Sequence, residues 1–171
     1  PTETHLFALD TSVAVPLLSQ SHTAHDSILA WAEHKTLTLS SHAATETYSV
    51  LTRLPKDARL SPEDAVLLIN DNFKTILVVP QQISEHAHEI CAERGIAGGA
   101  VYDALVALAA KKNNTVLVTR DVRAIPTYQM IGARVEVLYT QYRCLQQSPV
   151  GDAFQVFSRK IQLAHVGDFP Y

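Results

Sequence analysis

Short aliphatic and β-branched runs alternate with longer segments of helical periodicity along this chain. The short runs predict strands at residues 6–9, 37–39, 76–79, 115–119 and 135–138. Strands that are separated by helices pair in parallel through right-handed crossovers, and the helices then cover both faces of the sheet. We therefore predict an α/β protein, a three-layer α/β/α sandwich with a mostly parallel central sheet.

Helix start and stop signals lie between the predicted strands. Thr11 and Ser12 offer N-cap hydroxyls directly after the first strand, and Ser61 followed by Pro62 is a typical helix start. Gly95 is suited to end a helix. The predicted helices cover about residues 11–18, 22–34, 43–54, 83–94 and 100–112, with a further one that starts at 62.

Four acidic residues occupy positions where burial is expected. Asp10 and Asp121 each follow a predicted strand directly, Asp103 interrupts an apolar run over 99–110, and Glu46 lies inside a predicted helix. Burying an ionised carboxylate is costly unless it is paired or binds a cation, and the sequence offers no matching set of interior Lys or Arg. The four carboxylates therefore predict a site for a hard cation, Mg²⁺ or Mn²⁺.

The predicted topology brings these carboxylates to one edge of the sheet. Ligands of open parallel sheets bind outside the carboxyl ends of the strands, so Asp10 and Asp121 meet there if strands one and four are neighbours. Asp103, on the helix that feeds strand four, points toward the same edge, and Glu46 follows strand two. A metal at such a site lowers the pKa of a bound water, orients a phosphodiester and neutralises charge on the leaving oxygen.

Each acidic residue also has a structural interpretation that stays open at this point. Asp10 and Asp121 are suited to cap helices, and Glu46 has the alternative of a solvated side chain, as is usual for a glutamate in a helix. Asp103 gains nothing from capping in the middle of an apolar helix, so its alternative is a buried ion pair with Arg94 or Arg120. The four together favour the metal site more strongly than any one of them does.

Basic and histidine side chains give weaker signals. Arg120 and Arg123 flank Asp121 and either hold substrate phosphates or form a surface ion pair. A basic rim for RNA could be formed by Lys111–Lys112 and by Arg53, Lys56 and Arg59, whereas the alternative for lysines in a last helical turn is simply a favourable helix C-terminus. Two close histidine pairs have no Cys or third His to complete a metal site, and we interpret them as solvated: His22 with His25, and His86 with His88.

Length and composition fit one domain. The chain has 171 residues, of which 47% are hydrophobic, enough for a sizeable core. A formal charge of −3 argues against a broad, non-specific nucleic-acid binder, although carboxylates that await metal also lower the net charge of a nuclease. Only two cysteines, no signal-like start and no apolar run of membrane-spanning length favour a reducing cytoplasm.

Taken together, these motifs resemble the PIN-domain ribonucleases, specifically the toxins of VapBC-type toxin–antitoxin pairs. The order, spacing and context of the motifs agree over residues 5 to 138. The matching pieces are Leu9-Asp10-Thr11-Ser12, Glu46, the run from Gly99 to Leu105 around Asp103, Val118-Thr119-Arg120-Asp121, and Val135 to Leu138.

The resemblance implies an activity and partners. It implies metal-dependent RNA cleavage, dimerisation, and inhibition by an antitoxin whose tail enters the acidic groove. The four carboxylates fall on acidic positions of the family, and Thr11, Ser12 or Thr119 would support the ligands or the phosphate. We expect a PIN-like nuclease domain over 1–138, followed by an extension over 139–171 that is an arm, an appended helix or sequence added during cloning.

Two other hypotheses compete with the nuclease. Asp10 is placed like the phosphorylated nucleophile of aspartate-dependent phosphatases, but these carry a second acid two residues on, where this chain has Ser12. The other is a catalytically inactive PIN-like domain used only for binding, since fold does not fix function. The complete acidic set favours the metal-dependent endoribonuclease.

Overall fold

A computed structural model describes residues 6–139, and in this part of the chain the predicted strands form one parallel five-stranded sheet of order β3-β2-β1-β4-β5. The α/β prediction is confirmed, and strands one and four are neighbours with Leu9 opposite Val118. The strands are β1 (Leu6–Leu9), β2 (Thr36–Ser40), β3 (Ile76–Leu77), β4 (Val116–Thr119) and β5 (Arg134–Val137).

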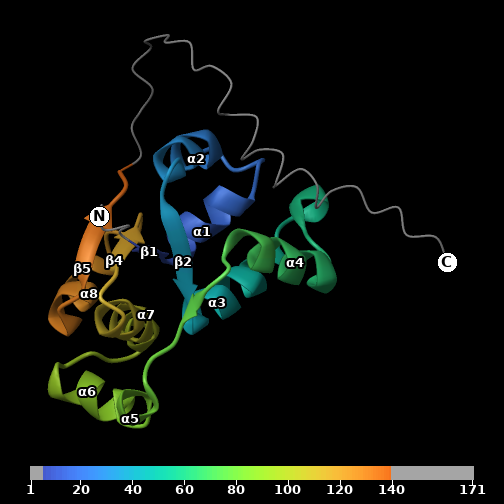
Figure 1. Ribbon diagram of the computed structural model, residues 1–171. Helices are drawn as coiled ribbons and strands as arrows, with labels where there is room; N and C mark the ends of the chain where they lie inside the picture. Colours follow the sequence, from blue (N-terminus) through green and yellow to red (C-terminus); the bar gives the residue numbers. More distant parts are fainter. Residues whose placement is uncertain (1–5, 140–171) are drawn as a thin grey trace.

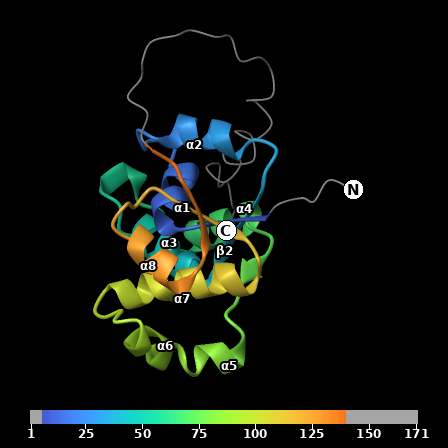
Figure 2. The same cartoon turned by 90° about the vertical axis from the view of Figure 1, so that its left-hand side faces the viewer.

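Helices cover both faces of this sheet. As right-handed crossovers require, α1, α3 and α4 lie on one side and α7 and α8 on the other, with α5 and α6 outside α7 (Figures 1 and 2). The helices are α1 (Thr11–Leu18), α2 (His25–Ala32), α3 (Ser41–Leu51), η1 (Lys56–Ala58), α4 (Pro62–Asn72), α5 (Gln81–Ser84), α6 (Ala87–Glu93), α7 (Ala100–Lys112) and α8 (Ile125–Ile131).

Several local expectations differ from the structure, and the strand predicted over 76–79 covers only Ile76–Leu77. The predicted helix over 83–94 is broken into α5 and α6, and α8 is not predicted at all. The N-cap of α1 is Asp10 rather than Thr11 or Ser12, because the Asp10 carboxylate accepts a hydrogen bond from the Val13 N–H. The expected extension after residue 139 lies outside the described residues.

The core lies between the interior strands and the helices that cover them. Leu9, Leu39 and Leu117 come from three neighbouring strands and are fully buried, and Ala107 and Ala110 let α7 pack closely on the sheet. Among residues 6–139, no helix has the length and apolar character to cross a bilayer. The rigid sheet fixes where each strand ends, and therefore where the residues that follow each strand are placed.

Removing a core side chain from β4 tests this packing. Leu117→Ala should lower the free energy of unfolding by about 2–5 kcal/mol, because it leaves a cavity between two packed layers. The exposed α4 position is the control, and Val66→Ala should change stability by less than about 0.5 kcal/mol. Urea unfolding followed by circular dichroism measures both, and a loss below about 1 kcal/mol for Leu117→Ala would contradict this description of the core.

Candidate active site

The four acidic residues predicted from the sequence line one open cavity of about 410 Å³ at the carboxyl edge of the sheet. Asp10 follows β1, Asp121 follows β4, and Asp103 lies in the first turn of α7. Glu46 is on the middle of α3. Strand order therefore gathers side chains that are more than 100 positions apart in the chain.

Asp10 is buried and is held by donors on both of its oxygens. Its Oδ1 accepts from the Ser12 hydroxyl at 2.5 Å and from the Val13 N–H at 3.2 Å. Its Oδ2 accepts from the Thr119 hydroxyl and, at 3.1 Å, from the phenol of Tyr128. Burial raises the pKa of Asp10, while these four hydrogen bonds act in the opposite direction. The carboxylate is therefore fixed in one orientation.

The two hydroxyls that hold Asp10 also organise the end of β4. The Ser12 hydroxyl accepts from the backbone N–H of Arg120 at 2.7 Å, and the Thr119 hydroxyl accepts from the backbone N–H of Asp121 at 2.9 Å. Each hydroxyl donates to the carboxylate and accepts from the backbone, so its hydrogen-bonding capacity is largely used. This network couples the turn after β1 to the turn after β4.

Asp103 carries the clearest sign of crowded negative charge. Its pKa is raised to about 6, first by burial and then by the negative charges of Asp121, Glu46 and Asp10, while Arg123 acts in the opposite direction. The sequence hypothesis of a buried ion pair with Arg94 is wrong, because the guanidinium of Arg94 reaches the backbone of its own helix and an adjacent glutamate instead.

Asp121 is paired with an arginine two residues on. The Arg123 guanidinium donates to both oxygens of Asp121 at 3.0 Å, which lowers the pKa of Asp121. The Arg123 side chain is 88% exposed. Of the two alternatives that the sequence offers for Arg123, the structure shows the surface ion pair. Such a pair contributes little to stability and leaves Arg123 free to change partners.

Glu46 has the most solvated position of the four. Its carboxylate is exposed and accepts a hydrogen bond of 2.6 Å from the Thr11 hydroxyl, in the first turn of α1. All three hydroxyl residues named from the sequence thus contact an acidic residue: Thr11 reaches Glu46, while Ser12 and Thr119 reach Asp10.

These residues fit a divalent cation that keeps part of its water shell. The donors are all carboxylates, which hard cations prefer, and their mutual repulsion is what a cation relieves. Within the described part of the chain, no three His, Cys, Asp or Glu side chains already converge on one ion position. Because the oxygens of Asp10 and Asp121 contact protein donors, a bound ion would displace a donor or reach them through its waters.

Sequence reasoning missed two residues that line the cavity. Tyr128 comes from α8, the helix that was not predicted, and its buried phenol has a pKa raised above the usual range. His22 was interpreted as solvated, but it is half-buried at the cavity with Nδ1 accepting from the Ala24 N–H. The same interpretation is wrong for His25, which is buried against the carbonyl of Pro16.

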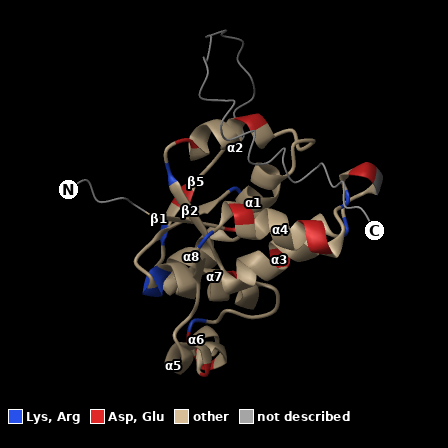
Figure 3. Ribbon diagram, turned by 45° about the vertical axis from the view of Figure 1, so that its right-hand side comes forward, with Lys and Arg blue, Asp and Glu red and all other residues tan. Residues whose placement is uncertain are grey.

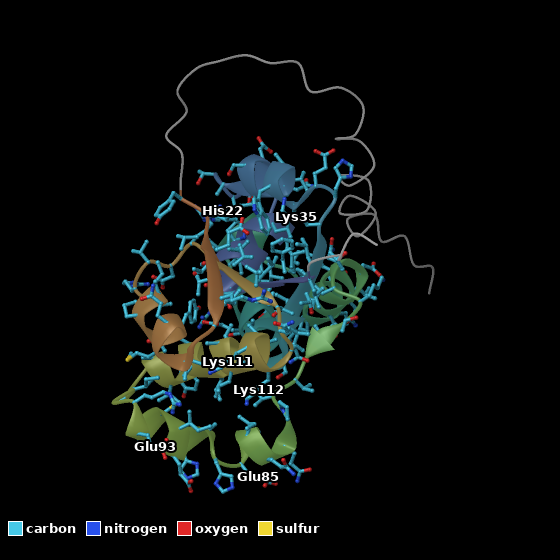
Figure 4. All side chains as sticks on the ribbon, turned by 60° about the vertical axis from the view of Figure 1, so that its left-hand side comes forward. His22, Lys35, Glu85, Glu93, Lys111 and Lys112 are labelled. Carbon is cyan, nitrogen blue, oxygen red and sulfur yellow. The ribbon has the colours of Figure 1, made fainter. Side chains whose placement is uncertain are left out.

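Other charged groups lie outside the cavity. Glu85 and Glu93 belong to the α5–α6 region, at the opposite end of the molecule from His22 (Figure 4). Lys111 and Lys112 end α7, far along that helix from Asp103, and Lys111 donates to the Ile131 carbonyl. Lysines and arginines are spread over several elements of the described chain (Figure 3). The basic rim is therefore not formed by the lysine pair.

Comparison with known proteins adds independent information. The family model of the PIN domain matches residues 7–127. Ribonuclease VapC27 of Mycobacterium tuberculosis (strain ATCC 25618 / H37Rv) is 52% identical over 130 residues, which cover 76% of this chain and 95% of that protein. Ribonuclease VapC40 of Mycobacterium tuberculosis (strain CDC 1551 / Oshkosh) is 37% identical over 134 residues, which cover 78% of this chain and 99% of that protein.

Solved structures share the fold. VapBC2 from Rickettsia felis, crystallised with a DNA fragment from its promoter, gives a TM-score of 0.56 at 16% identity, over 78% of this chain and 98% of that chain. VapC20 of Mycobacterium tuberculosis, a sarcin-ricin loop cleaving toxin, gives 0.55 at 19% identity, over 74% of this chain and 95% of that chain. At these identities the likeness concerns the fold alone.

The raised pKa of Asp103 predicts a pH-dependent stability in EDTA. The folded chain holds the Asp103 proton up to about pH 6, whereas the unfolded chain releases it near 3.8, so this residue lowers stability as the pH rises through that window. Asp103→Asn should therefore be more stable than the natural chain at about pH 7.5, by about 1–2 kcal/mol, and should lose this advantage near pH 4.

The exposed Asp71 provides the matched control for this measurement. Asp71→Asn should change stability only slightly at either pH, because it removes one exposed ion pair with Lys74, and exposed pairs contribute little. Urea unfolding at each pH measures all three proteins. An advantage of Asp103→Asn that did not depend on pH would refute the electrostatic cause.

Proposed function

The chain belongs to the PIN-domain family, and on that premise we propose that it is the ribonuclease toxin of a toxin–antitoxin pair, an endoribonuclease that depends on Mg²⁺ or Mn²⁺. The observation that carries this proposal is the gathering of Asp10, Glu46, Asp103 and Asp121 around one cavity. It occurs in a chain that is 52% identical to a ribonuclease over 95% of that protein's length. The likeness to solved structures supports the fold on which this assignment rests.

Each acidic residue has a distinct part in the proposed site. Asp10, fixed by four donors, provides a rigid oxygen ligand, and Asp103 and Asp121 provide ligands on the facing elements. Glu46, on α3, is solvated and would contact the metal ion through a bound water molecule. When bound, the metal supplies a Lewis acid that activates water and neutralises charge on the phosphate.

The basic side chains serve the substrate in this proposal. Arg120 lines the cavity, and Arg123 can leave Asp121 for a phosphate oxygen when a cation takes its place. Attack by water in line with the departing 3′ oxygen needs no 2′-hydroxyl nucleophile. The preference for RNA must then come from contacts beside the carboxylates rather than from the reaction itself.

The proposed partners follow from the family. We expect an antitoxin that neutralises the toxin by covering the acidic cavity, and a homodimer in the cytoplasm. The fold neighbour from Rickettsia felis is a toxin–antitoxin complex, which supports the antitoxin. The antitoxin for this cavity would place a cationic side chain among carboxylates that repel one another.

The second candidate is a PIN-like domain that binds RNA without cutting it. The observation in its favour is that protein donors already occupy the oxygens of Asp10 and Asp121. The two candidates differ in metal binding, since a module that only binds RNA does not need it. Calorimetric titration with Mn²⁺ separates them: no binding at millimolar concentrations would favour the second.

Neutralising a single carboxylate tests the proposed nuclease. Asp103→Asn should lower the rate of RNA cleavage by at least about 100-fold and weaken Mn²⁺ binding, because it removes a charged ligand while it preserves shape. Asp10→Asn should do the same, but its amide NH2 also faces groups that donate to the carboxylate, so a loss of stability is expected beside the loss of activity. Cleavage of end-labelled RNA with Mg²⁺, and the same reaction in EDTA, measures the activity. Calorimetry measures the metal.

The controls separate catalysis from folding. Asp71→Asn changes the net charge equally, far from the cavity, and should cut RNA at the natural rate. Circular dichroism should show the same helix content in all variants. A fully active Asp103→Asn protein, or cleavage that persists in EDTA, would refute the assignment.

A further inference from the structure

An aromatic pair lies on the surface where α3 and α7 begin. The rings of His42 and Tyr102 are stacked, with their centroids 5.3 Å apart and their planes within 3° of parallel. His42 is half-buried, whereas Tyr102 is 60% exposed. A ring that is backed on one face and exposed to this degree presents a flat apolar surface to solvent.

This pair is connected to the acidic cavity through neighbours on two elements, Glu46 and Asp103, which both line it. On α3, His42 and Glu46 are four residues apart and share one face of the helix. On α7, Tyr102 directly precedes Asp103, and the two helices pack against each other (Figure 1). Glu46 and Asp103 are close enough for the charge of one to raise the pKa of the other. The aromatic pair therefore extends the edge of the site along its α3–α7 side.

The tryptophan of the chain has no such free surface. Trp31 packs edge to face against Phe7, carries the ammonium of Lys35 over its ring at 4.9 Å, and donates its indole N–H to Glu136 at 2.7 Å. These internal contacts explain its position without a ligand. Tyr102 differs, because one face of its ring is stacked on the half-buried His42 and the side chain is 60% exposed.

We propose that Tyr102, backed by His42, stacks an unpaired base of the RNA substrate next to the phosphodiester that is cut. This inference rests on the proposed ribonuclease function. The carboxylates of the site repel the phosphates of RNA, so attraction between charges contributes little affinity at this site. Stacking of a base on an aromatic ring does not depend on charge and can supply that affinity. A base in a duplex is already stacked on its neighbours, so the platform accepts only nucleotides in single-stranded loops or ends.

Abasic substitution tests the platform directly. The probe is a fluorescein-labelled single-stranded RNA, prepared with a natural base everywhere or with one abasic nucleotide at each position in turn. Binding is measured by anisotropy with the full chain carrying Asp103→Asn, which we expect to be inactive in cleavage. One abasic position should weaken binding by about 5- to 150-fold, the range expected for the loss of one stacked base.

Substitutions at position 102 then assign that loss to the ring. Adding Tyr102→Ala should weaken binding of the intact RNA by a similar factor and remove the discrimination against the abasic position. Tyr102→Phe should bind as the parent does, and Tyr102→Leu should resemble alanine, because a leucine is apolar but cannot stack. Leu67→Ala, at a similarly exposed position of α4, is the control and should match the parent.

Three results would overturn the platform. One is unchanged affinity and abasic discrimination in the Tyr102→Ala protein, and another is a leucine variant that binds like the phenylalanine variant. The third is conversion of a dimer to a monomer by Tyr102→Ala in sedimentation, with equal loss for every RNA, which would make the pair a contact between subunits. Failure of the parent to bind any RNA would reject the proposed function itself, and so differs from all three.

Discussion

The hydrogen bonds around the Asp10 carboxylate are the constraint on which the edge of the sheet depends. They connect the end of β1, through Ser12 and Thr119, to the end of β4, and they bring in Tyr128 from α8. The backbone N–H of Asp10 also donates to the Val118 carbonyl, which continues the pairing of the two strands. A carboxylate placed there caps a helix, fixes two turns and presents negative charge to one cavity. Structural and functional interpretations of this residue are therefore compatible.

The cost of this arrangement appears at Asp103. Its pKa is raised because the opposing charge of Arg123 does not offset burial and the charges of three neighbouring carboxylates. Arg123 neutralises Asp121 but is exposed, so it offsets the repulsion only in part. A site that is electrostatically unfavourable without a cation is prepared to bind one, and here its carboxylates are placed by the ends of two strands and by two helices.

Patterns within a segment could be predicted from the sequence, whereas contacts between segments could not. The strands, their parallel pairing and the positions of Asp10 and Asp121 follow from hydrophobic periodicity and from what comes directly after each strand. The helix that carries Tyr128 has only seven residues and begins at Ile125-Pro126, which gave too weak a signal. The hydrogen bond between Tyr128 and Asp10 joins residues 118 positions apart. No local pattern contains that information.

The acidic character of the site sets what else it needs in order to hold RNA. Phosphate contacts usually provide most of the affinity for a nucleic acid, yet this chain carries a formal charge of −3 and its basic residues are dispersed (Figure 3). Arg120 and Arg123 can position one phosphate group of the RNA, but the four carboxylates repel the phosphate groups on either side of it. Affinity that does not depend on charge must then come from the bases, and the exposed ring of Tyr102 lies beside the cavity where such a contact can act.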